Sequence, residues 1–362
     1  MIQRIAINTG GGDAPGLNAV IQAATISASK LGWEVFGIRE GYSGLLDPQN
    51  YPDGGLIRLT PEMVQDISHL GGTILGTVNK GNQFKITGTL KGGSSVEVDR
   101  SDELLEAFRR NKLDALIAIG GDGSLTIANS FHERGLRVVG VPKTIDNDLK
   151  STSMTFGYQT AVSFATECID RLHSTADAHR RVIVVEVMGR YAGWIALLSG
   201  IAGRASAILI PEIPYSIEKV AEYIKGRNQP YSIVVVAEGA KEVSGEVMVM
   251  ARESGRQERL GGVAEKIAAQ LQEMTGKESR ALVLGHLLRG GSPIAFDRIL
   301  GLSFGAAAVD ALAKGENGVM VALHPPYIEL VPLKEAISET KLVPMDGEAV
   351  MTARALGLCL GD

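Results

Sequence analysis

Two aspartates and a lysine lie close together in VPKTIDNDLK, residues 141–150. If this segment is extended, alternation places Asp146 and Asp148 on one side with Thr144, and Lys143 on the other. Two carboxylates beside a phosphate–Mg²⁺ site are costly unless they do chemistry, and one of them could accept a proton from a substrate hydroxyl. The alternative is an Asx-rich turn with no chemical role.

Two glycine-rich segments have the composition of phosphate-binding loops: NTGGGDAPGLNAV (8–20) and IGGDGSLTIA (119–128). Each runs from an apolar stretch into a helical pattern, and bare backbone N–H groups at a helix N-terminus suit a phosphate. Asp122 could hold Mg²⁺, and Ser124 could cap the next helix. Pro15 breaks the dinucleotide fingerprint and no P-loop occurs, so neither of those sites is predicted. Glycines that only make tight turns are the alternative.

Arginines accompany three further apolar runs: Arg181, Arg190, Arg280 and Arg289. Glu238 and His286 lie near the ends of the same runs. Arginine suits bidentate capture of a phosphate, although each of these arginines could instead be a solvated surface charge.

The elements that position these residues alternate along the chain. Short apolar runs predict buried strands within 4–13, 33–44, 115–124, 137–148, 181–190, 205–212, 232–240 and 281–291. Helical patterns occupy 16–31, 101–111, 124–134, 158–174, 216–226 and 262–275. This order predicts an α/β fold with mainly parallel sheets flanked by helices, and ligands at the carboxyl ends of the strands. Residues 86–99 indicate a hairpin or exposed loop, and 248–262 a surface excursion.

Composition limits the function classes. The 362 residues include 36 basic and 41 acidic ones, a net charge of −5 that gives no reason to expect nucleic acid as a partner. A length of this size favours two domains. No signal-like or membrane-spanning apolar stretch is visible, so we expect a cytoplasmic protein without a membrane partner. Cys168 and Cys359 are expected to be buried thiols.

The motifs together resemble those of 6-phosphofructokinases. GGDAPGLN, GGTILGT, IGGDGS, PKTIDND, RVIVVEVMGR, AEGA and LGHLLRGGSP occur in that family's order and cover nearly the whole chain. The resemblance implies ATP-dependent phosphorylation of the 1-hydroxyl of fructose 6-phosphate to fructose 1,6-bisphosphate, a step of glycolysis, with Mg²⁺.

The resemblance also assigns roles to individual residues. Asp146 would be the general base, and Thr144 and Asp148 would help hold substrate and metal. Asp122 would hold Mg²⁺. The donor would contact Gly12, Asn79, Lys80, Gly121, Asp122, Gly123, Ser124 and Lys143. Fructose 6-phosphate would contact Thr144, Asp146, Met188, Gly189, Arg190, Glu238, His286 and Arg289, with Arg190 also catalytic. Arg181 and Arg280 would reach in from a neighbouring subunit.

The family resemblance implies two Rossmann-like domains with the active site in the cleft between them. Residues 1–156 plus about 290–340 would bind the donor. Residues 157–289 plus the tail at about 341–362 would bind fructose 6-phosphate. The assembly would be a homotetramer or a homodimer.

Departures from the best-known bacterial pattern concern the donor and regulation. Asn79 replaces an arginine that touches the donor phosphates, and Lys143 resembles the pyrophosphate-dependent branch. Gly123, however, replaces the aspartate usual in that branch, whose charge and bulk would collide with a nucleotide α-phosphate. ATP is therefore the expected donor and pyrophosphate the alternative.

Regulation is expected to be weak. The family's effector-binding arginines appear as Gln22, Ile26 and His173, which predicts little response to ADP or phosphoenolpyruvate. A catalytically silent sensor of sugar phosphates or nucleotides is the remote alternative on the same fold. The retained Asp122, Asp146 and Arg190 argue against it.

Overall fold

The computed structural model describes residues 2–78, 85–89, 95–243, 245, 249–251 and 259–362. The chain divides into two compact units, each of which is described by itself. Unit 1 comprises Met1–Thr144, Leu149–Gly157 and Arg289–Glu339. Unit 2 comprises Ile145–Asp148, Tyr158–Leu288 and Thr340–Asp362.

The sheet of unit 1 has seven strands in the order β15-β14-β7-β6-β1-β2-β3. They are β1 (Arg4–Thr9), β2 (Glu34–Ile38), β3 (Leu56–Leu59), β6 (Ala115–Gly120), β7 (Arg137–Pro142), β14 (Val319–His324) and β15 (Tyr327–Pro332). The inner strands pair in parallel, and β3 and β15 add an antiparallel strand at each edge. The expected mainly parallel sheet is thus confirmed.

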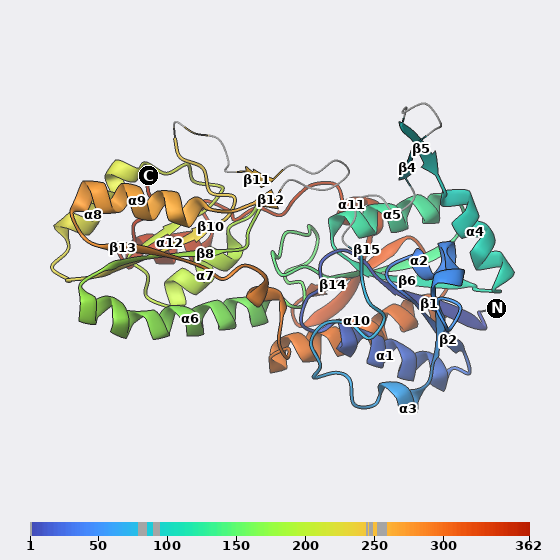
Figure 1. Cartoon of the computed structure of the whole chain (residues 1–362). Helices are drawn as coiled ribbons and strands as arrows, with labels where there is room; N and C mark the ends of the chain where they lie inside the picture. The colour runs from blue at the N-terminus through green and yellow to red at the C-terminus, as the bar shows by residue number, and fades with distance from the viewer. Residues whose placement is uncertain (1, 79–84, 90–94, 244, 246–248, 252–258) are drawn as a thin grey trace. The chain divides into compact units, whose positions relative to one another are not determined.

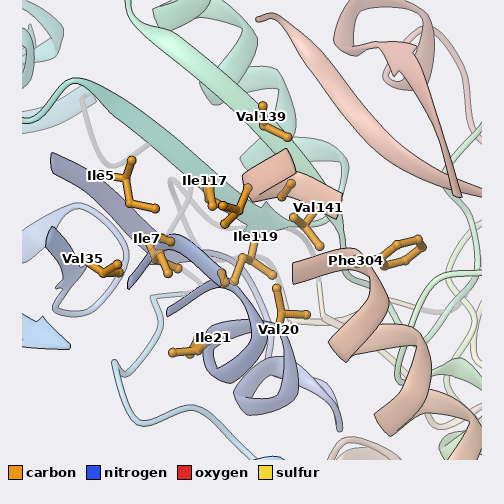
Figure 2. Close-up of a cluster of buried hydrophobic side chains, with 14 of the residues drawn as sticks. Ile5, Ile7, Val20, Ile21, Val35, Ile117, Ile119, Val139, Val141 and Phe304 are labelled. Atoms are coloured by element: carbon orange, nitrogen blue, oxygen red, sulfur yellow. The ribbon is translucent and has the colours of Figure 1, made fainter. Parts of the chain in front are cut away.

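Both faces of this sheet are covered by helices. On one face, α1 (Leu17–Lys30) and α10 (Ala295–Ala313) lie side by side (Figure 1), and their apolar residues pack against Ile5, Ile117 and Val139 (Figure 2). On the other face, α4 (Ser101–Arg110) and α5 (Asp122–Glu133) pack against alternate residues of the same strands. Burial on both faces explains why the strands read as continuous apolar runs without alternation.

Unit 2 contains a four-stranded, fully parallel sheet in the order β13-β8-β10-β9. Its strands are β8 (Val182–Val187), β9 (Ala207–Leu209), β10 (Ser232–Ala237) and β13 (Ser279–Val283). One face packs against α8 (Ile217–Gly226) and α9 (Val263–Thr275). The other face contacts α6 (Tyr158–His179) and α7 (Trp194–Ala202), and α12 (Glu348–Ala355) lies against α7.

Smaller elements complete the described part of the chain. β4 (Lys85–Thr89) and β5 (Ser95–Asp99) pair antiparallel, which confirms the hairpin expected in 86–99. β11 (Val249–Ala251) and β12 (Arg259–Leu260) pair antiparallel within the expected surface excursion. Short helical segments are α2 (Ser43–Leu46), η1 (Pro48–Asn50), α3 (Pro61–Val64), η2 (Gly285–Arg289) and α11 (Leu333–Ala336). Cys168 and Cys359 are half-buried rather than fully buried, and both are free thiols.

The sequence patterns did not indicate α7 or α10. In α10 the reason is visible, because small residues on its buried side contact α1 backbone to backbone. A Cβ added at Gly305 would lie 2.4 Å from the carbonyl oxygen of Val20, and one at Gly301 would lie 3.0 Å from that of Gly16. This close approach uses glycines and alanines in place of large apolar residues at helical spacing, so the usual periodic signal is weak. Within the described residues, no helix combines the length and apolar character needed to cross a membrane.

Phe304 tests the core formed by α1, α10 and the sheet. Its side chain is fully buried (0% exposed), whereas Ile299 on the same helix is 63% exposed. Phe304→Ala removes a large buried ring and should lower the free energy of unfolding by about 3–5 kcal/mol. The control Ile299→Ala should lower it far less. Urea denaturation followed by circular dichroism measures both, and equal losses for the two variants would contradict the packing described.

Candidate active site

The two glycine-rich loops meet at one edge of the sheet in unit 1. β1 and β6 are parallel neighbours, so the loops that follow them emerge together, and the Gly10 N–H donates to the carbonyl of Ile119 (2.9 Å). A Cβ added at Gly120 would lie 2.3 Å from Cβ of Ser124, and one at Gly10 would lie 2.6 Å from its hydroxyl. Ser124 therefore fills the space between two bare backbones, which only glycine permits.

The N-terminus of α5 lies at the same edge. The helix begins at Asp122, and Gly121 caps it without a side-chain hydrogen bond. The prediction that Ser124 caps this helix is wrong, because Ser124 is already its third residue. Asp122 and Gly123 are exposed, and a Cβ added at Gly123 would meet no atom within 4 Å. The first turn of α5 thus offers N–H groups next to open space, which suits a phosphate.

The donor set at this edge also suits Mg²⁺ bound together with a phosphate. Asp122 presents an exposed carboxylate in the first turn of α5. In the described part of the chain, no group of three or more His, Cys, Asp or Glu residues could form a metal cage. Mg²⁺ needs no such cage, since it commonly takes one or two carboxylates together with water and substrate phosphates.

Two cations flank the glycine loop after β1. Lys143 is buried (3% exposed), and its ammonium group donates to the carbonyl of Gly12. Nη1 of Arg289 donates to the carbonyl of Asp13 (3.1 Å) and would lie 2.7 Å from a Cβ added at Gly12. Arg289 was expected among the sugar-phosphate residues and in the second domain, but these contacts place it in unit 1 beside Gly12.

A third loop supports the glycine loop, and sequence reasoning missed the residue that organises it. Asn18 is buried; its amide donates to the carbonyls of Leu70 and Gly71 and accepts from the Ile74 N–H (2.9 Å). Thr77 then donates to the carbonyl of Gly11 (2.6 Å). The available signal was a lone asparagine on the buried face of an apolar helix. The predicted donor residues Asn79 and Lys80 lie outside the described residues.

The segment with two aspartates forms a turn. Residues 145–146 are in a turn and Asn147 has a left-handed backbone (φ 51°), so the premise of an extended chain is wrong. The grouping of side chains nevertheless holds, because burial alternates. Lys143, Ile145 and Asn147 are buried, and Thr144, Asp146 and Asp148 are partly exposed.

Two contacts from the C-terminal segment explain why this turn belongs to unit 2, although residues 145–148 were expected in the first domain. The backbone N–H of Lys341 donates to the carbonyl of Asp148 (2.8 Å). The Lys341 ammonium group donates to Oδ1 of Asn147 (3.0 Å). On the unit 1 side of the boundary, the hydroxyl of Thr155 donates to the carbonyl of Thr144 (2.6 Å).

The predicted sugar-phosphate residues of unit 2 follow the carboxyl ends of its parallel strands. β8, β10 and β13 are parallel and end next to one another: Ala237 pairs with Val187, and Val283 pairs with Glu186. The residues that follow are Met188, Gly189 and Arg190 after β8, Glu238 after β10, and His286 after β13. The Glu238 N–H donates to Val187 (2.9 Å) and the Gly239 N–H to Gly189 (3.1 Å), which joins two of these loops directly.

Arg181 and Arg280 lie at the opposite end of the same strands, where β8 and β13 begin. Arg181 precedes β8 and Arg280 is the second residue of β13, so the length of a six-residue strand separates Arg181 from Arg190, roughly 20 Å. Arg181 pairs with Glu278 (Nε–Oε2 2.7 Å), and Arg280 pairs with the same carboxylate. The hydrogen bond from Arg181 is the main reason that the pKa of Glu278 is lowered. Unit 2 therefore does not bring these two arginines together with Arg190.

Three residues occupy positions where the family has effector-binding arginines, and all three make contacts within the chain. Gln22 donates to the carbonyl of Gln65 (2.5 Å) and Ile26 is half-buried against the core. Both ring nitrogens of His173 have partners, the Tyr231 hydroxyl (3.1 Å) and the Gly203 carbonyl (2.7 Å). Weak regulation by ADP or phosphoenolpyruvate stays a prediction.

Substituting two glycines of one loop tests the cradle around Ser124. Gly120→Ala places a methyl group against Ser124 and should destabilise the protein by about 1–3 kcal/mol through overpacking. Gly123→Ala is the matched control, because its methyl group would meet open space. The free energy of unfolding measured in urea should fall only for Gly120→Ala. A loss at position 123 alone would contradict the geometry.

Comparisons with known proteins agree on one family. A family model described as phosphofructokinase matches residues 4–312. An ATP-dependent 6-phosphofructokinase of Chloroflexus aurantiacus is 50% identical over 363 residues, which cover 99% of this chain and 98% of that protein. A pyrophosphate–fructose 6-phosphate 1-phosphotransferase of Amycolatopsis mediterranei is 46% identical over 348 residues, which cover 95% of this chain and 97% of that protein.

A solved structure has a similar fold. Pichia pastoris phosphofructokinase in the T-state superposes with a TM-score of 0.78 at 32% identity. The match covers 93% of this chain and 36% of the larger yeast chain. The match of the family model to most of the chain and the 50% identity to a full-length relative agree with these loops at the sheet edges. The chain therefore belongs to the phosphofructokinase family.

Proposed function

We propose that the protein transfers the terminal phosphoryl group of ATP to the 1-hydroxyl of fructose 6-phosphate, giving fructose 1,6-bisphosphate as in glycolysis. The relatives that support this activity differ in their donor, as their names state. The observation that carries the choice of ATP is the open space at Gly123 in the first turn of α5, where an added Cβ meets no atom within 4 Å. A glycine here would leave room for a nucleotide α-phosphate, which the charge and bulk of an aspartate would exclude.

Unit 1 would bind the donor. The first turn of α5, the glycine loop after β1, the Lys143 ammonium group and the residues Asn79 and Lys80 would contact its phosphates. Backbone N–H groups and a fixed cation stabilise the charge of a phosphoryl group without having to reorganise. Asp122 would hold Mg²⁺, and that ion would supply positive charge to the donor phosphates.

Unit 2 would bind fructose 6-phosphate with the residues at the carboxyl edge of its sheet. Arg190 would bind the sugar phosphate, with Met188, Gly189, Glu238 and His286 beside it. Arg289, which lies in unit 1, is the remaining residue that the family resemblance assigns to fructose 6-phosphate. An arginine can grip a phosphate through two parallel hydrogen bonds, which fixes the orientation of the sugar.

Asp146 would be the general base. In this role its carboxylate accepts the proton of the 1-hydroxyl as the oxygen attacks the transferred phosphorus. Thr144 and Asp148, which are partly exposed beside it, would help hold substrate and metal.

The assembly would be a homotetramer or a homodimer. Arg181 and Arg280, at the far edge of the sheet from Arg190, would complete the site of a neighbouring subunit. This accounts for their distance from the other sugar-phosphate residues of their own chain. The cytoplasmic location stays a prediction of the sequence.

Pyrophosphate is the second candidate donor, because Lys143 resembles the pyrophosphate-dependent branch of the family. A buried ammonium group at the glycine loop attracts a small, highly charged donor as well as it attracts ATP. Lys143 therefore does not discriminate between the donors, whereas the open space at Gly123 favours the larger one.

A paired donor assay tests the proposed activity. Purified protein with fructose 6-phosphate and Mg²⁺ should form fructose 1,6-bisphosphate with ATP, and turnover with pyrophosphate alone would overturn the donor assignment.

Asp146→Asn removes the base and should lower kcat by about 10²–10⁴-fold. Calorimetry should show that the variant still binds fructose 6-phosphate. Unchanged turnover would contradict the role of Asp146 as general base.

A charge introduced at Gly123 tests the donor assignment separately. Gly123→Asp should lower kcat/KM for ATP, because two like charges about 4 Å apart repel by about 1–4 kcal/mol. At about 1.4 kcal/mol per tenfold change, this is a loss of roughly fivefold to several hundredfold. The control Gly226→Asp adds the same charge at an exposed glycine of unit 2 that also meets no atom within 4 Å. Equal use of ATP by Gly123→Asp and wild type would contradict the assignment.

A further inference from the structure

The C-terminal segment of unit 2 contacts the turn that carries Asp146. We call residues 340–343 the C-terminal strap. The Lys341 backbone N–H donates to the carbonyl of Asp148 (2.8 Å), and its ammonium group donates to Oδ1 of Asn147 (3.0 Å). Both bonds therefore end within two residues of Asp146.

The same strap is attached to α7, which follows the loop that contains Arg190. Nε1 of Trp194, the first residue of α7, donates to the carbonyl of Lys341 (3.0 Å). The Lys341 ammonium group also lies 5.7 Å from the centre of the Trp194 ring, within the range of a cation–π contact.

Glu212 adds a second attachment between the strap and this loop. Its carboxylate accepts from the N–H groups of Val343 (2.9 Å) and Gly193 (3.1 Å). Burial is the main reason that the pKa of Glu212 is raised. The strap thus joins the turn at 145–148 to the start of α7 through two independent sets of bonds.

The conformation of the turn explains why it needs external support. Asn147 has a left-handed backbone (φ 51°), which residues with a side chain adopt infrequently, and it is 3% exposed. A buried amide loses its hydrogen bonds to water and needs partners inside the protein. The Lys341 ammonium group supplies one to the Asn147 side chain, and this bond holds the residue between the two aspartates in place.

The ammonium group is itself held in a partly desolvated place. Burial lowers the pKa of Lys341 to about 8, and the nearby carboxylate of Asp148 opposes this shift. A lysine that served only to fill space would not need to keep its charge there, because burying a charge is unfavourable unless it is paired. Here the charge lies near a carboxylate, an amide oxygen and an aromatic ring.

We propose that Lys341 is a positioning residue: it holds Asn147 and so orients Asp146 for proton transfer, and it couples this turn to the loop that carries Arg190. The inference rests on the proposed function, in which Asp146 is the base. Lys341 touches no reacting atom in this role and acts only through Asn147, Asp148 and Trp194.

Lys341→Met tests the proposal, with Lys334→Met as a control at an exposed lysine of α11. A small displacement of a reacting group can cost about 100-fold in rate, so kcat of Lys341→Met should fall by about 10- to 100-fold. KM for ATP should stay within about twofold, because Asp146 acts in the chemical step rather than in donor binding. Lys334→Met should behave like wild type. A kcat of Lys341→Met within twofold of wild type would overturn the proposal.

Tryptophan emission gives a readout that does not depend on activity. The chain has two tryptophans, Trp33 and Trp194, and only Trp194 lies against the Lys341 ammonium group. At one fixed pH, the emission maximum of Lys341→Met should therefore differ from that of wild type. Identical emission spectra of the two proteins would contradict the arrangement.

A second variant covers the case in which Lys341→Met does not fold. Trp194→Phe keeps an aromatic ring but removes the bond to the Lys341 carbonyl, and it should lower kcat by severalfold with KM for ATP unchanged. If the wild-type protein does not phosphorylate fructose 6-phosphate, the proposed function itself is refuted. If Asp146→Asn abolishes the activity but Lys341→Met and Trp194→Phe do not change it, only the proposed role of the strap is refuted.

Discussion

The inner strands of each sheet are parallel and buried on both faces, and the positions of the loops depend on this packing. In unit 1, adjacent residues of β6 pack into different clusters, Ile117 toward α1 and α10 and Leu116 toward α4 and α5. Parallel strands fixed in this way all end at one edge. The loops after β1 and β6 must therefore emerge side by side, whatever their own sequences prefer.

Close backbone approach then shapes these loops. Ser124 fits between Gly10 and Gly120, and a Cβ added at Gly239 would lie 2.0 Å from the carbonyl oxygen of Arg190. In both units, a glycine allows one loop to rest directly on its neighbour. The exposed Gly123 is different, because it leaves space rather than filling it. Glycines in these loops are therefore found in two settings, contact between neighbouring loops and open space at the start of α5.

The segment 141–150 shows how far the sequence alone leads. Its two aspartates and lysine were correctly placed after a buried strand, and the grouping of Asp146 and Asp148 on the side away from Lys143 was predicted. The conformation was not, because the left-handed Asn147 depends on contacts with Lys341, almost two hundred residues further along the chain. Likewise α10 was not predicted, because its glycines allow a close contact with α1 that no local sequence pattern indicates.

The sequence by itself determined the α/β class, most strands and helices, and the motifs that identify the family, because apolar periodicity and loop composition are local properties. Tertiary structure alone decided which side chains meet. It placed Arg289 beside Gly12, moved residues 145–148 into unit 2, and set Lys341 against Asn147 and Trp194. These contacts join residues far apart in the chain, and only the folded packing of the core brings such residues within hydrogen-bonding distance.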